Sequence, residues 1–290
     1  MRRCKHPPAR VSLPGTPAVA RTSAAPSRSP AARARGRNGA AMKFLRTLLA
    51  CAALSLSAFA ETPLDVSAAT SLRDVLTELK TLYAHSHAGV AVTVTFSGSG
   101  VIQRQIESGL PADVFISASP REIFALEKKE LLVRDSIRNL ARNTLVLIVP
   151  KENTTVHAWG DLTRPDVRHI AIGDPRSVAA GLYAMETFAS LKLTDAVTPK
   201  LVNLLDVRQV LTNVGSGDAD AGVVYATDAR GSAKVRIAAP AEAKTHQTIL
   251  YPCAIPKGSK QKDAARDFIA FLVSPPARAV FEKHGFLPPP

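Results

Sequence analysis

Three short segments of this chain combine small residues and hydroxyl groups with the expected start of a helix. They are FSGSG at 96–100, GDPRSVAAGLY at 173–183 and DVRQVLTNVGSGDADAGVVY at 206–225. The first turn of a helix has backbone N–H groups without partners and a partial positive charge, so it attracts anions. These segments offer no metal-ligand cluster, no paired carboxylates and no nucleophile beside a base. They therefore indicate a protein that binds an anion and is not an enzyme.

A single helix start is a weak indication, because serine or aspartate there more often caps the helix than contacts a ligand. This chain has four such starts, which are Thr70-Ser71, Gly98-Ser99-Gly100, Ala179-Ala180-Gly181 and Asp206-Val207. Two lie in each half of the strand–helix pattern. The combination is more specific than any one of them.

Strands and helices are expected to alternate along the chain. The hydrophobic patterns predict strands at 64–68, 90–96, 114–118, 144–149, 170–172, 222–225, 235–238 and 251–255. Helices are expected at 71–83, 99–108, 120–129, 181–191, 206–214, 264–273 and 277–284. This alternation is typical of an α/β fold. The apolar strands at 144–149 and 251–255 both run into Pro-Lys and suggest two crossings between two lobes.

We therefore assign 61–143 plus 247–290 to lobe 1 and 144–246 to lobe 2. A ligand of such a protein is expected at the carboxyl ends of the strands, in the cleft between the lobes.

The chain resembles the periplasmic molybdate-binding proteins of ABC importers. The resemblance rests on AATSLRDVL (68–76), FSGSGVIQRQIESGLPADVFISA (96–118), GDPRSVAAGLYA (173–184), DVRQVL (206–211), AGVVYATDA (221–229) and FEKHGF (281–286), in this order. It implies a two-lobed, periplasmic-binding-protein-like fold of type II. It also implies a monomer without a cofactor, which captures molybdate or tungstate and delivers it to a membrane permease.

The resemblance also assigns the groups that hold the oxyanion. They are the hydroxyls of Ser71 and Ser99 in lobe 1, and the backbone N–H groups of Ala180 and Val207 with the hydroxyl of Tyr225 in lobe 2. One departure is Ala179, where the family usually has proline as the first helical residue. The alternative is a binding protein for another tetrahedral oxyanion such as sulfate, because the sequence does not give the size of the cavity.

The formal charge of +13 would suggest nucleic acid, but the basic residues are unevenly distributed. Residues 1–60 carry eleven of the 37 basic residues and none of the 24 acidic ones, which leaves 26 basic and 24 acidic residues in 61–290. The folded part is therefore nearly neutral, and we expect no nucleic-acid partner.

Residues 42–60 have the three parts of a secretory signal peptide: a charged start, an apolar run, and Ala58-Phe59-Ala60 before Glu61. We expect cleavage after Ala60 and export to the periplasm. Residues 1–41 predict a disordered basic extension, and Met42 is the expected true start. Lipid anchoring at Cys51 is an alternative to cleavage after Ala60.

Several other patterns are weaker. His85 and His87 lack a third ligand, so we expect no metal site there. A hydrolase with Ser99 as nucleophile would need glycine two residues before it, where Ser97 stands. Direct contact of Arg208 with the oxyanion is the second choice to the neutral groups named above. Asp206 is expected to cap its own helix.

Overall fold

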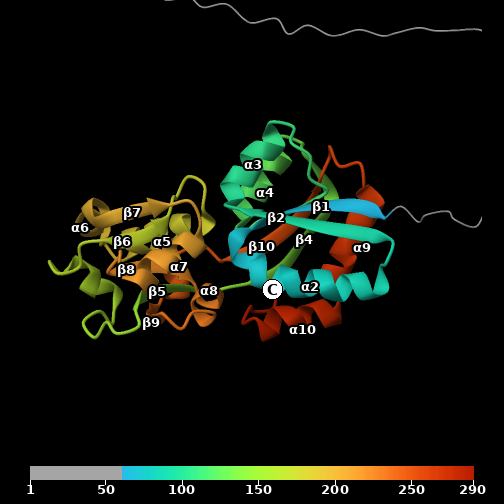
Figure 1. The fold of residues 1–290 in the computed structure, drawn as a ribbon. Helices are drawn as coiled ribbons and strands as arrows, with labels where there is room; N and C mark the ends of the chain where they lie inside the picture. The colour runs from blue at the N-terminus through green and yellow to red at the C-terminus, as the bar shows by residue number, and fades with distance from the viewer. Residues whose placement is uncertain (1–60) are drawn as a thin grey trace, which may run out of the picture. The chain divides into compact units, whose positions relative to one another are not determined.

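The computed structural model of this protein describes residues 61–290, as two β-sheets with helices packed against them (Figure 1). The predicted extension at 1–41 and the predicted signal peptide at 42–60 lie outside the described residues. Within 61–290, no helix combines the length and apolar character needed to cross a membrane.

The first sheet has the strand order β2-β1-β3-β10-β4. Its strands are β1 (Thr62–Ala69), β2 (Val90–Ser97), β3 (Val114–Ile116), β4 (Leu132–Arg142) and β10 (Leu250–Pro256). β1 pairs in parallel with β2 and β3, whereas β10 is antiparallel to β3 and β4. The parallel part therefore places the carboxyl ends of β1, β2 and β3 at one edge.

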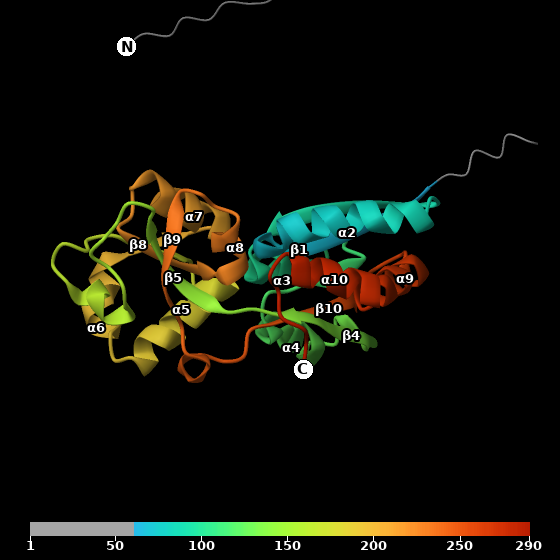
Figure 2. The ribbon, with the colours of Figure 1, turned by 90° about the horizontal axis from the view of Figure 1, so that it is seen from below.

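Helices cover both faces of this sheet (Figures 1 and 2). On one face lie α2 (Arg73–Ser86), α9 (Lys262–Leu272) and α10 (Pro275–Lys283). The short 3-10 helix η1 (Thr70–Leu72) directly precedes α2 in the chain. On the other face lie α3 (Ser99–Glu107) and α4 (Pro120–Lys128). Buried residues of α3 and α4 form a separate hydrophobic cluster with Phe115 and Ala254 of the sheet.

The second sheet has the order β7-β6-β8-β5-β9. Its strands are β5 (Leu145–Pro150), β6 (Ile170–Gly173), β7 (Leu201–Leu204), β8 (Ala221–Tyr225) and β9 (Val235–Pro240). β6 is parallel to β7 and β8, and β5 is antiparallel to β8 and β9. The accompanying helices are α5 (Ala179–Ser190), α6 (Thr194–Val197), α7 (Val207–Ser216) and α8 (Ala226–Arg230), with 3-10 turns η2 (Trp159–Thr163), η3 (Thr198–Lys200) and η4 (Ala243–Thr245).

Two crossings join the sheets, as the chain passes from β4 to β5 and from β9 to β10. In each sheet the central strand has a parallel pair on one side and an antiparallel pair on the other. The predicted α/β class is confirmed. We propose that residues 61–143 and 247–290 form lobe 1, which contains all strands of the first sheet. Residues 144–246 would form lobe 2, which contains all strands of the second sheet.

The sequence patterns missed two strands. β4 carries four charged residues, and its pairing with β10 shifts register twice, so its buried positions do not alternate regularly. β7 has four residues at the edge of its sheet. Both lack the period of two that predicts a half-buried strand, because the pairing of β4 is irregular and β7 is only four residues long.

Candidate anion-binding site

A small cavity lies where strands of both sheets end. It contains about 220 Å³ of empty space, which includes the part open to solvent. All five residues predicted to hold the oxyanion line it: Ser71, Ser99, Ala180, Val207 and Tyr225. They follow or end five strands, β1, β2, β6, β7 and β8 respectively. In each sheet the parallel strands end at one shared edge, which brings together residues that are far apart in the sequence.

Ser99 is the first residue of α3 and is 1% exposed. Its Oγ accepts a hydrogen bond from the backbone N–H of Ala118 at 3.0 Å. A serine hydroxyl has one hydrogen and can also accept, so this bond leaves its hydrogen free for another acceptor. Ser99 is therefore set up to donate into the cavity that it lines.

The glycines on either side of Ser99 let the two sheets' loops approach each other closely. A Cβ on Gly98 would lie 2.6 Å from the carbonyl oxygen of Ser177. The N–H of Gly100 donates to that same oxygen at 3.0 Å. These glycines therefore bring the loop after β2 against the loop after β6, which the sequence did not indicate.

Ser71 lies in η1 and is 7% exposed. Its Oγ is 3.3 Å from the hydroxyl oxygen of Tyr251, a residue of β10 that sequence reasoning missed. The adjacent Thr70 also lines the cavity, and its Oγ1 is buried without a hydrogen-bond partner among the described residues.

Ala180 and Val207 lie in the first turns of α5 and α7, where backbone N–H groups have no acceptor within the helix. Asp206 caps α7, because its carboxylate accepts from the N–H groups of Arg208 at 2.8 Å and Gln209 at 3.0 Å. This cap leaves the Val207 N–H to the cavity and confirms the role expected for Asp206. A Cβ on Gly181 would lie 1.8 Å from the oxygen of Gly173, so only glycine lets α5 begin this close to β6.

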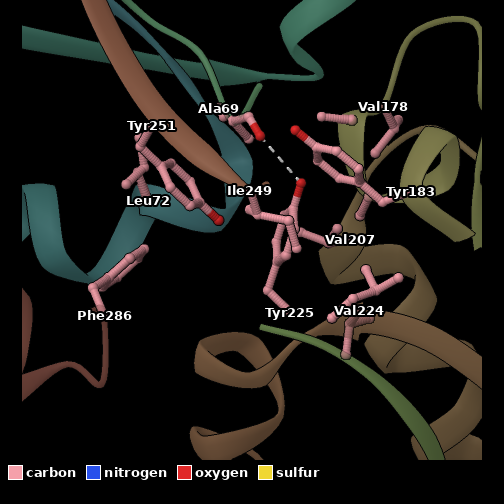
Figure 3. Close-up of a cluster of buried hydrophobic side chains, with 14 of the residues drawn as sticks. Ala69, Leu72, Val178, Tyr183, Val207, Val224, Tyr225, Ile249, Tyr251 and Phe286 are labelled. Atoms are coloured by element: carbon pink, nitrogen blue, oxygen red, sulfur yellow. Dashed lines mark hydrogen bonds between the residues drawn. The ribbon is translucent and has the colours of Figure 1, made fainter. Parts of the chain in front are cut away.

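Tyr225 ends β8, and its hydroxyl crosses to the first sheet's side of the cavity. It donates a hydrogen bond to the carbonyl oxygen of Ala118 at 3.4 Å. Figure 3 labels Tyr225 and marks the hydrogen bond of its hydroxyl with a dashed line. The side chain is 1% exposed, and burial raises the pKa of its hydroxyl well above the ordinary value. Tyr225 therefore keeps its proton and acts as a donor.

Charged groups contribute little to this wall. Asp206 is the one ionisable carboxylate among the lining residues, and its Oδ1 accepts both hydrogen bonds of the helix cap. Arg208 does not line the cavity; its guanidinium donates to Asp74 of α2 instead. His85 and His87 also lie outside the lining, and the ring of His87 stacks on Tyr83. In residues 61–290, no three His, Cys, Asp or Glu side chains cluster as metal ligands.

Residues 64–287 match the family described as bacterial extracellular solute-binding proteins. The chain belongs to this family. It is 40% identical over 224 residues to the putative ABC transporter substrate-binding lipoprotein YvgL of Bacillus subtilis, covering 77% of this chain and 85% of that protein. It is 35% identical to the molybdate-binding protein ModA of Haemophilus influenzae, over 83% of this chain and 96% of that protein.

A solved structure is also similar. The substrate-binding domain of a putative molybdenum ABC transporter from Clostridium difficile is 38% identical, with a TM-score of 0.63. The similarity covers 79% of this chain and all of that domain. The two-lobed fold expected from the sequence is therefore confirmed.

Behind the cavity, this solute-binding protein buries the carboxyl group of Asp228, which is 2% exposed. Its Oδ2 accepts from the N–H of Tyr225 at 3.3 Å, while its Oδ1 has no partner among the described residues. Burial raises the pKa of this carboxyl from 3.8 to about 7, and the positive charge of Arg208 opposes part of that rise. The group is therefore protonated in the folded protein well above the pH at which it ionises in the unfolded chain.

This difference makes stability depend on pH. Between about pH 4 and pH 7 the folded state binds the Asp228 proton and the unfolded state does not, so stability falls as pH rises. Relative to Asp228→Asn, the wild-type protein should lose roughly 1 kcal/mol per pH unit across this window. Urea unfolding of both proteins at several pH values measures the difference and cancels the contributions of other groups. Parallel pH profiles would show that Asp228 ionises normally in the folded state.

Proposed function

We propose that this protein captures molybdate, and tungstate, outside the cytoplasm and delivers it to the permease of an ABC importer. The observation that carries this proposal is the convergence of the five predicted residues, Ser71, Ser99, Ala180, Val207 and Tyr225, on one cavity. The names of the relatives from Haemophilus influenzae and Clostridium difficile support the choice of molybdate.

The cavity suits a fully ionised tetrahedral anion because its walls offer hydrogen-bond donors. The hydroxyl of Ser99 and the N–H groups of Ala180 and Val207 have hydrogen available for a ligand. The Tyr225 hydroxyl donates its one hydrogen to the Ala118 carbonyl at 3.4 Å, and it would turn this hydrogen to a bound oxyanion. Each hydrogen bond to a charged group contributes about 1.5–3 kcal/mol. Five such bonds, after the costs of association, are compatible with micromolar or tighter binding, about −8 kcal/mol.

Both lobes contribute donors, so we infer that binding closes the cleft between them. Three contacts already join the lobes around the cavity: Gly100 to Ser177, Tyr225 to Ala118, and Arg208 to Asp74. The buried Thr70 hydroxyl, which has no partner among the described residues, would gain one from a bound oxyanion.

The remaining parts of the proposal follow from this role. The protein is a carrier and not an enzyme, and it needs no cofactor and no resident metal ion. We propose that it acts as a monomer in the periplasm, after removal of a signal peptide, with the permease as its protein partner and without nucleic acid.

Anion selectivity tests the proposal directly. We expect isothermal titration to show tight binding of molybdate and tungstate, and far weaker or no binding of sulfate and phosphate. Protonated phosphate needs an acceptor that the cavity does not offer, and sulfate differs in size. At 100 times Kd, molybdate should add about 2.7 kcal/mol of stability and raise Tm by roughly 5–11 °C. Equal affinity for sulfate would favour the alternative of a general oxyanion-binding protein.

Substitution of one hydroxyl donor from each lobe tests the position of the site. Ser99→Ala and Tyr225→Phe should each weaken molybdate binding about 10- to 150-fold, because each removes one hydrogen bond to a charged ligand. His85→Ala and His87→Ala serve as controls and should leave the affinity unchanged, since neither residue lines the cavity. Wild-type affinity in both Ser99→Ala and Tyr225→Phe would place the site elsewhere.

A further inference from the structure

The hydroxyl of Ser71 can either donate a hydrogen bond to a ligand or accept one, and its neighbours decide which. We propose that Asn143 and Tyr251 form a hydrogen-bond relay that fixes the Ser71 hydroxyl as a donor into the cavity. The proposal rests on the proposed function and adds two positioning residues that lie outside the lining of the cavity.

The relay begins at Asn143, whose amide orientation is fixed by the backbone. Its Oδ1 accepts from the N–H of Thr144 at 2.9 Å. Its Nδ2 donates to the hydroxyl oxygen of Tyr251 at 3.1 Å and to Oγ1 of Thr227 at 2.9 Å. An amide nitrogen has two hydrogens and cannot accept, so Asn143 is the donor and Tyr251 the acceptor in this hydrogen bond.

The Tyr251 hydroxyl links Asn143 to Ser71. Its oxygen accepts a hydrogen bond from Asn143 Nδ2. The same hydroxyl oxygen lies 3.3 Å from Ser71 Oγ. Burial raises the pKa of the Tyr251 hydroxyl well above its ordinary value, so the group keeps its hydrogen. The Asn143 Nδ2 can only donate, and Ser71 Oγ is the other hydrogen-bond partner of the Tyr251 hydroxyl among the described residues, so we assign the Tyr251 hydrogen to Ser71 Oγ.

With this assignment, the Ser71 hydroxyl has the same hydrogen-bond arrangement as the Ser99 hydroxyl. Each serine oxygen accepts one hydrogen bond from the protein, from Tyr251 in one case and from the Ala118 N–H in the other. In each case the serine hydrogen remains for a second partner, and both serines line the cavity. A donor that is already oriented loses less rotational freedom when it binds an anion.

The relay is also anchored at the junction of the lobes. Asn143 lies between β4 of the first sheet and β5 of the second, and its second donor bond reaches Thr227 in α8. The residue that orients a serine of lobe 1 is therefore held by a residue of lobe 2.

Tyr251 also packs against other rings, and this second role must be separated from the relay. Figure 3 shows its ring between the rings of Phe286 and Tyr225. The ring centroids of Phe286 and Tyr225 lie 5.2 and 5.8 Å from that of Tyr251, respectively. Tyr251→Phe keeps this packing and removes only the hydroxyl. The variant thus isolates the hydrogen-bond function.

A double-mutant cycle on molybdate affinity tests the relay, with titration of wild type, Tyr251→Phe, Ser71→Ala and the double variant. Without Tyr251 as donor, the Ser71 hydroxyl must be ordered on binding, which costs about 0.5–1.5 kcal/mol or roughly 2- to 12-fold in affinity. We expect that loss in the wild-type background and less than a twofold change in the Ser71→Ala background. The same loss in both backgrounds would overturn the relay, because Tyr251 would then act by packing alone.

Asn143→Leu tests the first step, since it removes both amide donors and keeps a side chain of similar size. It should weaken binding at least as much as Tyr251→Phe and add little to that variant. Fully additive losses would contradict the relay.

Tyr83→Phe is the matched control, because Tyr83 is a buried tyrosine whose hydroxyl has no partner among the described residues. It should change affinity less than twofold, and a loss equal to that of Tyr251→Phe would count against the relay. Thermal unfolding without anion verifies that each variant is folded. If Ser71→Ala itself binds molybdate like wild type, the proposed site fails; if it binds weakly while the cycle is additive, the site stands and the relay fails.

Discussion

The central constraint on this structure is that a doubly charged anion taken out of water must be surrounded by hydrogen-bond donors. A neutral acceptor or a carboxylate facing the anion would leave repulsion that the buried site cannot screen. In the site that we propose, the hydroxyls of Ser99 and Tyr225 and the first-turn N–H groups of Ala180 and Val207 would meet this constraint. These groups are neutral, so the empty site carries no charge of its own that would need a partner.

Two acceptors near the cavity, Asp206 Oδ1 and the carbonyl oxygen of Ala118, already have donors. The Asp206 carboxylate caps α7 through the N–H groups of Arg208 and Gln209. The carbonyl oxygen of Ala118 accepts a hydrogen bond from the Tyr225 hydroxyl. The N–H of Ala118 donates to Ser99 Oγ. In the relay that we propose outside the cavity lining, Asn143 and Tyr251 orient the Ser71 hydroxyl as a donor in the same way. Binding and fold are thus linked through the direction of hydrogen bonds and not through a single strong charge.

Residues at the starts of helices are the part of the candidate site that the sequence could predict. Ser71, Ser99, Ala180 and Val207 each follow a strand within a few residues, so local patterns and the family resemblance both indicated them. Tyr251 and Asn143 could not be found in this way. Ser71 and Tyr251 are 180 positions apart, and Asn143 and Tyr251 are 108 apart, so only the pairing of β10 with β3 and β4 brings them near the cavity. β4 itself was missed because its charged residues and register shifts conceal its pattern.

Anion binding in this cavity can be tested with a crystal structure of the protein soaked with tungstate, in which anomalous scattering locates tungsten. We expect one strong tungsten peak in the cavity. The hydroxyls of Ser71, Ser99 and Tyr225 and the N–H groups of Ala180 and Val207 should lie within hydrogen-bond distance of its oxygens. A tungsten peak outside this cavity, or one whose oxygens are held by Arg208 or another charged side chain, would show that neutral donors of this cavity do not hold the anion.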